Sequence, residues 1–96
     1  MSLQAPRLAV TASALLLAAA VPAFAYSGEA LASKAKVQIT EARAIALKAH
    51  PGTIADEELE QEHGGLRYSF DIRNGAAVQE VGVDAQTGAV LENKPD

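Results

Sequence analysis

The sequence predicts an α+β domain in which one helix packs on an antiparallel meander of three to four strands. Apolar residues recur at helical spacing between residues 42 and 49, and after Gly52 the pattern changes to the alternation of a strand. Two dipeptides, Gly64-Gly65 and Asn74-Gly75, are typical of hairpin turns between such strands. Cysteine is absent from the 96 residues, so disulfides and thiolate-bound metals cannot stabilise this small domain.

Residues 1–25 have the three parts of a secretory signal peptide. Arg7 is the only charged residue before Glu29, and an apolar run follows at 8–21. Ala23-Phe24-Ala25 then supplies the small residues that a signal peptidase accepts, so cleavage is predicted after Ala25. The alternative is an uncleaved anchor, but this run rises only about 21 Å as a helix, against a hydrocarbon core of about 30 Å. We expect a periplasmic or secreted chain with no stable membrane span after cleavage.

The chain that remains after cleavage is acidic. Without Arg7, seven Lys and Arg residues stand against twelve Asp and Glu residues, which gives a net charge of −5. This balance disfavours nucleic acids and anionic membrane surfaces as partners. Two Phe and two Tyr residues also offer few platforms for stacking bases. No nucleic-acid partner is therefore expected.

The helix is predicted to begin with Thr40 as its N-cap and to end at His50-Pro51-Gly52, because the residue before a proline is driven out of the helical conformation. One helix face carries a stripe of small and apolar residues: Ala42, Ile45, Ala46 and Ala49. Since most of this stripe is alanine, the helix can approach one sheet face closely, and the other face is expected to stay solvated. Residues 26–36 are expected to be a linker or short helix before the domain proper at 37–94.

One strand of the central hairpin alternates apolar with polar residues, and its apolar members are Leu66, Tyr68, Phe70 and Ile72. A two-residue Asn74-Gly75 loop sets the register and places Tyr68 opposite Val81. Phe70 then faces Gln79, which interrupts the apolar face. Gln79 is expected either to contact the helix terminus or to lie at the open end of the sheet.

A further strand is predicted before this hairpin. A two-residue Gly64-Gly65 loop places Leu59 opposite Phe70. On the other face, the same register places Glu62 opposite Arg67.

The chain is predicted to return once more after the hairpin. Residues 84–88 form a turn cluster, in which the Asp84 side chain is expected to accept hydrogen bonds from backbone amides. A short fourth strand is expected at 89–91.

Three ordered stretches carry a family likeness. They are residues 39–52 (ITEARAIALKAHPG), 58–72 (ELEQEHGGLRYSFDI) and 81–91 (VGVDAQTGAVL), the last with the pattern V-D-A-x-T-G-x-V. Together they resemble the PepSY domain family over roughly residues 37–94.

The resemblance implies a regulatory rather than a catalytic role. PepSY domains occur in the propeptides of thermolysin-like secreted peptidases, in membrane-bound proteins and as small exported bacterial proteins. The family is thought to inhibit or modulate peptidases, or to bind partners outside the cytoplasm. It has no established catalytic residues, so none is carried over. Because no peptidase is attached within these 96 residues, any target is expected to be a separate protein.

The acidic segment 56–62 is the most distinctive local feature. In an extended strand four carboxylates project to one side, about 6.6 Å apart: Asp56, Glu58, Glu60 and Glu62. This stripe is interpreted either as a docking surface for a basic partner or as an edge strand whose charges discourage edge pairing. In the edge-strand interpretation, Arg67 and Arg73 of the neighbouring strand neutralise part of the charge. The candidate partner surface comprises Glu58, Glu60, Glu62 and Arg67.

No catalytic, cofactor or metal site is expected. His50 lies at the predicted helix end and His63 beside a turn, and two histidines alone do not define a metal site. No base–nucleophile pair follows from the spacing of the residues.

The expected function is therefore that of a non-catalytic exported PepSY-type protein that binds and modulates a protein partner in the cell envelope, with a peptidase as one candidate. The alternative is a small periplasmic cation-binding protein that uses the acidic strand 56–62 with His63. A weak hydrolase is the least favoured interpretation.

Overall fold

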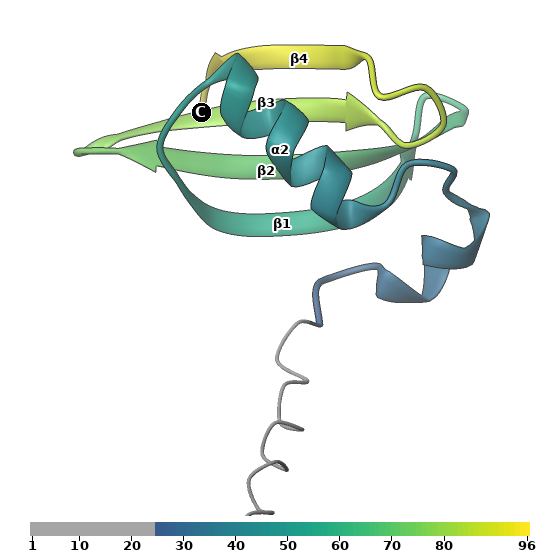
Figure 1. The fold of residues 1–96 in the computed structure, drawn as a ribbon. Helices are drawn as coiled ribbons and strands as arrows, with labels where there is room; N and C mark the ends of the chain where they lie inside the picture. Colours follow the sequence, from purple (N-terminus) through teal and green to yellow (C-terminus); the bar gives the residue numbers. More distant parts are fainter. Residues whose placement is uncertain (1–24) are drawn as a thin grey trace, which may run out of the picture.

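The computed structural model describes residues 25–96, and the predicted signal peptide lies outside the described residues apart from Ala25. The helices and strands are η3 (Glu29–Lys34), α2 (Ile39–Ala49), β1 (Thr53–Glu62), β2 (Gly65–Asn74), β3 (Ala77–Asp84) and β4 (Val90–Pro95). The strands form one antiparallel sheet in the order β1-β2-β3-β4, and α2 lies across one of its faces (Figure 1). The predicted fold class is confirmed, with four strands. No helix within residues 25–96 is long and apolar enough to cross a membrane.

The start of α2 differs from the prediction. The helix begins at Ile39, and Gln38 rather than Thr40 is its N-cap, with an extended backbone and no side-chain capping bond. The reason is tertiary, because Val37 is buried and its amide donates to the carbonyl of Ala85 at 2.9 Å. This anchor fixes where the chain enters the helix, and it outweighs the capping preference of threonine.

The end and the buried face of α2 are as predicted. The helix stops at Ala49, and His50 before the proline has an extended backbone. Ala42 and Ala46 are fully buried against the sheet. Their small side chains allow the close approach that the alanine stripe predicts.

The core lies between α2 and the sheet. Its largest fully buried side chains come from three strands: Leu59, Tyr68, Phe70, Ile72, Val81 and Val83. Leu66 is also buried, so the alternating apolar residues of β2 are buried together as predicted. The hydroxyl of Tyr68 donates to the carbonyl of Val37 at 2.7 Å, which satisfies the polar atom of this core residue.

The β1–β2 hairpin turns one residue earlier than predicted. Its loop is His63-Gly64, with φ angles of 54° and 81°, so Leu59 pairs with Tyr68 and Glu60 with Arg67. The predicted Gly64-Gly65 loop is wrong, as are its pairings of Leu59 with Phe70 and of Glu62 with Arg67. A type I′ turn needs two positive φ angles, which histidine tolerates better than most residues. The shift amounts to two residues, so every side chain keeps its predicted face.

The β2–β3 hairpin turns one residue later than predicted. Its loop is Gly75-Ala76, and only Gly75 has a positive φ angle, 67°, as a type II′ turn requires. Asn74 stays in the strand, where its side-chain amide donates to the carbonyl of Pro51 at 3.3 Å. The predicted pairing of Tyr68 with Val81 is therefore wrong.

The corrected register completes the apolar face. Tyr68 pairs with Val83, and Phe70 pairs with Val81. Gln79 moves to the end of the face, opposite Ile72.

Of the two predicted positions of Gln79, the structure shows the one at the end of the sheet, without a direct hydrogen bond to the helix terminus. Gln79 lies at the end of the apolar face, and its amide donates to Oδ1 of Asn93 at 2.7 Å. Asn93 in turn donates to the carbonyl of Ala49 at 3.4 Å, so Gln79 reaches the end of α2 through one intermediate side chain.

The chain after β3 returns as predicted, but β4 is longer than expected. Asp84 Oδ1 accepts the amides of Gln86 at 2.7 Å and Thr87 at 3.1 Å, which confirms its role in the turn. β4 continues to Pro95 because pairing with β3 uses the backbone and does not need apolar side chains. A bulge at Leu91 interrupts this pairing.

Candidate functional site: the acidic face of the sheet

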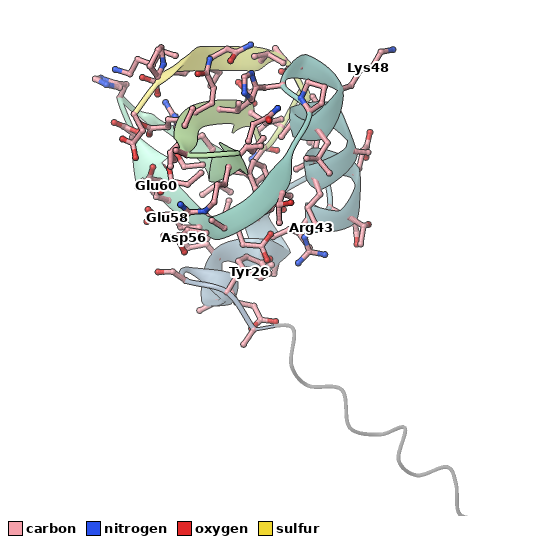
Figure 2. The ribbon with its side chains drawn as sticks, turned by 90° about the vertical axis from the view of Figure 1, so that its left-hand side faces the viewer. Tyr26, Arg43, Lys48, Asp56, Glu58 and Glu60 are labelled. Atoms are coloured by element: carbon pink, nitrogen blue, oxygen red, sulfur yellow. The ribbon has the colours of Figure 1, made fainter. Side chains whose placement is uncertain are left out.

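The sheet face that points away from α2, here called the outer face, is strongly charged. Figure 2 shows Asp56, Glu58 and Glu60 on this side of β1, whereas Arg43 and Lys48 lie on the helix side. The register aligns many carboxylates on the outer face: Asp56, Glu58, Glu60, Glu62, Asp71, Glu80, Asp84 and Glu92. The cations on the same face are fewer: Arg67, Arg73 and Lys94.

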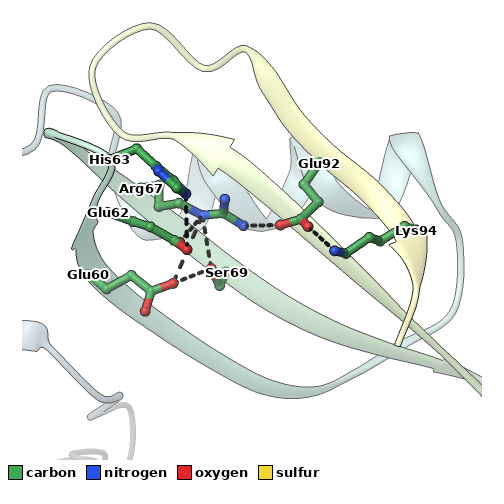
Figure 3. A network of polar contacts seen from close by, with 7 residues as sticks. All are labelled: Glu60, Glu62, His63, Arg67, Ser69, Glu92 and Lys94. Carbon is green, nitrogen blue, oxygen red and sulfur yellow. Dashed lines mark hydrogen bonds and ion pairs between the residues drawn. The ribbon is translucent and has the colours of Figure 1, made fainter.

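Arg67 lies at the centre of one polar network on this face, with a side chain only 9% exposed (Figure 3). Its Nη2 donates to Oε1 of Glu92 at 2.7 Å, and its Nε donates to Oγ of Ser69 at 3.1 Å. The Ser69 hydroxyl donates to Oε2 of Glu60 at 2.7 Å. Nε of Arg67 also lies 3.4 Å from Oε1 of Glu62.

Lys94 completes this network, because its Nζ lies 2.8 Å from the second carboxylate oxygen of Glu92. We call the whole set the Arg67 cluster: Glu60, Glu62, Arg67, Ser69, Glu92 and Lys94. It joins all of its carboxylates to a cation and links β1, β2 and β4.

Gly82 makes room for the guanidinium. A Cβ built on Gly82 would overlap Nη2 of Arg67 and would lie 2.6 Å from its Cζ. The guanidinium therefore lies flat against the backbone of β3, and Arg67 and Ser69 are both buried. The expectation that this whole face stays solvated is therefore wrong at Arg67 and Ser69. The reason is that Gly82 leaves space for the guanidinium and the surrounding carboxylates cover it.

The electrostatics of the cluster favour its ionised form. Burial opposes the charge of Arg67, but the hydrogen bond to Glu92 and the charges of Glu62, Glu92 and Glu60 raise its pKa above the usual value. Hydrogen bonds from Lys94 and Arg67 lower the pKa of Glu92. In this half of the outer face two cations therefore offset most of the charge of three carboxylates.

The other half of the outer face is less well compensated, although Lys94 is the partner of Glu80 in the register. The register places Asp71 directly between Asp56 of β1 and Glu80 of β3. Partial burial, followed by repulsion from neighbouring carboxylates, raises the pKa of Glu58, Asp71 and Glu80. We call Asp56, Glu58, Asp71 and Glu80 the acidic patch. Within residues 25–96 none of these four carboxylates forms an ion pair.

The structure divides the predicted partner surface between these two sets. Glu58 belongs to the acidic patch, whereas Glu60, Glu62 and Arg67 belong to the Arg67 cluster and already have partners. Asp71 and Glu80 were missing from the prediction. Both occupy polar positions of alternating strands, but only the correct hairpin loop brings them into one row.

The remaining candidate residues do not come together in one site. A groove of about 620 Å³ at the hairpin end of the Arg67 cluster is lined by His63, Arg67, Leu91 and Glu92 among others. His50 caps the end of α2 and lies apart from His63 in the sequence and the fold. Within residues 25–96 no group of three or more His, Asp or Glu side chains is placed to hold a metal ion. The alternative of a cation site on 56–62 gains no support from this geometry.

A further ion pair on the helix side has a structural role that the sequence pattern does not indicate. Arg43 donates through Nε and Nη2 to the two oxygens of Glu57, both at 2.8 Å. The hydrogen bond to Glu57 raises the pKa of Arg43. Glu57 alternates with the outer-face acids of β1, and it therefore faces α2 and fixes the helix to the edge of the sheet.

Comparisons with known proteins agree with this architecture. The family model described as the peptidase propeptide and YPEB domain (PepSY) matches residues 36–94. A search of curated proteins and a search of solved structures found no significant match. The matched range includes α2, β1, β2, β3 and all of β4 except Pro95, which is more than half of the chain. The chain therefore belongs to the PepSY family.

Proposed function

We propose that this chain is an exported, non-catalytic PepSY protein that binds a protein partner in the cell envelope and modulates it. The family description, which links such domains to peptidase propeptides, supports a peptidase as the class of partner. The signal-peptide pattern of residues 1–25 supports export.

The acidic patch is the observation that carries this proposal. Like charges directly opposite each other on neighbouring strands destabilise a sheet. Asp56, Asp71 and Glu80 stand in such a row, although the Arg67 cluster beside them is fully paired. A basic surface of a partner would neutralise the row and would be steered toward it by the net negative charge of the domain.

A charge-reversal experiment tests this surface. Glu58→Lys/Glu80→Lys is expected to weaken partner binding about tenfold or more and to flatten its dependence on salt. The control is Glu29→Lys/Glu41→Lys, which changes the net charge equally through exposed residues of η3 and α2. The partner is first captured from envelope extract by cross-linking and identified by mass spectrometry, and binding is then measured with purified components. Equal weakening by both double variants, or by neither, would reject the acidic patch as the binding surface.

The modulating role needs its own measurement. If the captured partner is a peptidase, its hydrolysis of a peptide substrate should change when the domain is added in saturating amount. The Glu58→Lys/Glu80→Lys variant should need about tenfold more protein for the same effect. If the hydrolysis rate stays unchanged while the domain is bound, modulation is contradicted and only binding remains supported.

A further inference from the structure

Residues 25–28 lie along the open edge of β1. Ser27 forms a parallel bridge with Glu58, and the amide of Leu59 donates to the carbonyl of Ser27 at 2.9 Å. A Cβ built on Gly28 would overlap the carbonyl oxygen of Leu59, so the two backbones are in close contact. The segment that follows the predicted cleavage site is therefore part of the folded domain.

The parallel bridge also places the predicted cleavage site. The bridge pairs Ser27 alone with β1, and Ala25 and Tyr26 directly precede it on the same edge. The ring of Tyr26 packs against the core. Ala25 and Tyr26 line a groove of about 300 Å³ together with Asp56 and Glu57. Figure 2 shows Tyr26 beside Asp56 at this edge of the sheet.

Only one of the two carboxylates in this groove is available for a new partner. Glu57 is held by Arg43 through two hydrogen bonds of 2.8 Å. Asp56 accepts a single hydrogen bond from the described residues, at Oδ1 from the amide of Glu57. The other charged or titratable groups that face Tyr26 are Glu29 of η3, Arg43 of α2 and Tyr68 of β2.

We propose that removal of residues 1–25 creates an ion pair between the new amino terminus of Tyr26 and Asp56. Hydrolysis of the Ala25–Tyr26 peptide bond consumes one water, leaves a carboxylate on Ala25 and leaves an α-ammonium group on Tyr26. Before cleavage this nitrogen is an uncharged amide. Tyr26 and Asp56 line the same groove, so the new ammonium group forms at that groove. The proposal rests on the predicted cleavage site and not on the proposed partner.

The new positive charge affects the electrostatics of the acidic patch as well as the edge of β1. An α-amino group has an ordinary pKa of about 7.7 to 8.0, so most of it is charged at neutral pH. Asp56 is one end of the row that continues through Asp71 and Glu80. Removal of residues 1–25 therefore places a cation beside this row of carboxylates and, in the same step, attaches the amino terminus to β1.

The test uses the processed chain recovered after export. A chain that begins at Tyr26 retains every described helix and strand and the whole buried core. Mass spectrometry is expected to find Tyr26 as its first residue. NMR titration of Tyr26 is expected to give an α-amino pKa above about 8, because a nearby carboxylate favours the charged form. Asp56→Asn should return this pKa to the ordinary range, whereas Asp56→Glu should keep it raised.

Glu62→Gln is the matched control, since it removes a carboxylate from the same strand and face but at the other end of β1. It should leave the α-amino pKa unchanged. A first residue other than Tyr26, or the same α-amino pKa in the wild type and in Asp56→Asn, would overturn the proposal. Both readouts use the domain alone, so they do not depend on whether a partner binds the acidic patch.

Discussion

Arg67 shows how one residue decides the character of a sheet face. A buried guanidinium is stable only when its hydrogen bonds are satisfied, and here Ser69 and Glu92 accept them. The position of the guanidinium depends equally on a residue that makes no polar contact, because Gly82 leaves the space in which it lies. Replacing either partner removes one of these hydrogen bonds and leaves the guanidinium with the ion pairs to Glu60 and Glu62.

Gly82→Ala is expected to lower the free energy of unfolding by about 1–3 kcal/mol, because the added methyl group displaces the Arg67 guanidinium from its partners. Urea denaturation followed by circular dichroism measures this loss. Gly65→Ala is the control, since a Cβ at Gly65 meets nothing within 4 Å. It should change the stability by less than about 0.5 kcal/mol. Equal stability of the two variants would show that the Arg67 cluster adjusts without cost.

At the scale of secondary structure, α2 is held to the sheet by two different means. Ala42 and Ala46 provide close apolar contact, but their small side chains bury little area. The bidentate pair of Arg43 with Glu57 adds a directional bond to β1. The pair compensates for a helix face that is poor in large side chains.

Arg43→Met and Glu57→Gln are expected to be coupled in a double-mutant cycle by about 1 kcal/mol, as a half-buried bidentate pair should be. Thermal or urea unfolding of the two single variants and the double variant gives this energy. Lys48→Met supplies the comparison, because Lys48 is an exposed cation of the same helix. Additive losses for Arg43 and Glu57 would contradict a direct role for the pair.

The secondary structure was largely predictable from the sequence, because alternation and helical spacing are local properties. Tyr68 and Phe70 lie on their predicted face, but each hairpin loop lies one residue away from its predicted position. His63 adopts a positive φ angle, and Asn74 remains in its strand, where it donates a hydrogen bond to Pro51. Neither feature can be inferred from the turn dipeptides alone. Because the register was predicted wrongly, the row of carboxylates that includes Asp71 and Glu80 was not recognised. The candidate surface was thus predicted along β1 and at Arg67 of β2, but not at Asp71 and Glu80, whose alignment depends on the register of both hairpins.

Over the whole molecule, the acidic patch makes folding sensitive to pH. The pKa values of Glu58, Asp71 and Glu80 are raised above their ordinary values of 4.5, 3.8 and 4.5. Each group binds its proton more tightly in the folded chain, so its contribution to stability is present at low pH and is lost as the pH rises through the raised value. Glu92 acts in the opposite sense, because its lowered pKa makes its contribution disappear on acidification.

The urea midpoint of the domain is therefore expected to rise as the pH falls from neutral toward the carboxyl range of about 4 to 5, and to fall again in stronger acid as Glu92 becomes protonated. The triple variant Glu58→Gln/Asp71→Asn/Glu80→Gln should be more stable than the wild type near neutral pH and should lose the rise. Urea titrations at several pH values measure both effects. A wild-type midpoint that decreases over the first interval is incompatible with this account.

The two borders of the sheet affect how copies of the chain can associate. Ser27 already occupies backbone positions of β1, while β4 is broken by the bulge at Leu91 and ends in Pro95, which has no amide hydrogen to offer. Both edges therefore offer a neighbouring copy a shorter row of unused donors and acceptors than their strand lengths suggest, and the like charges of β1 further discourage edge-to-edge pairing.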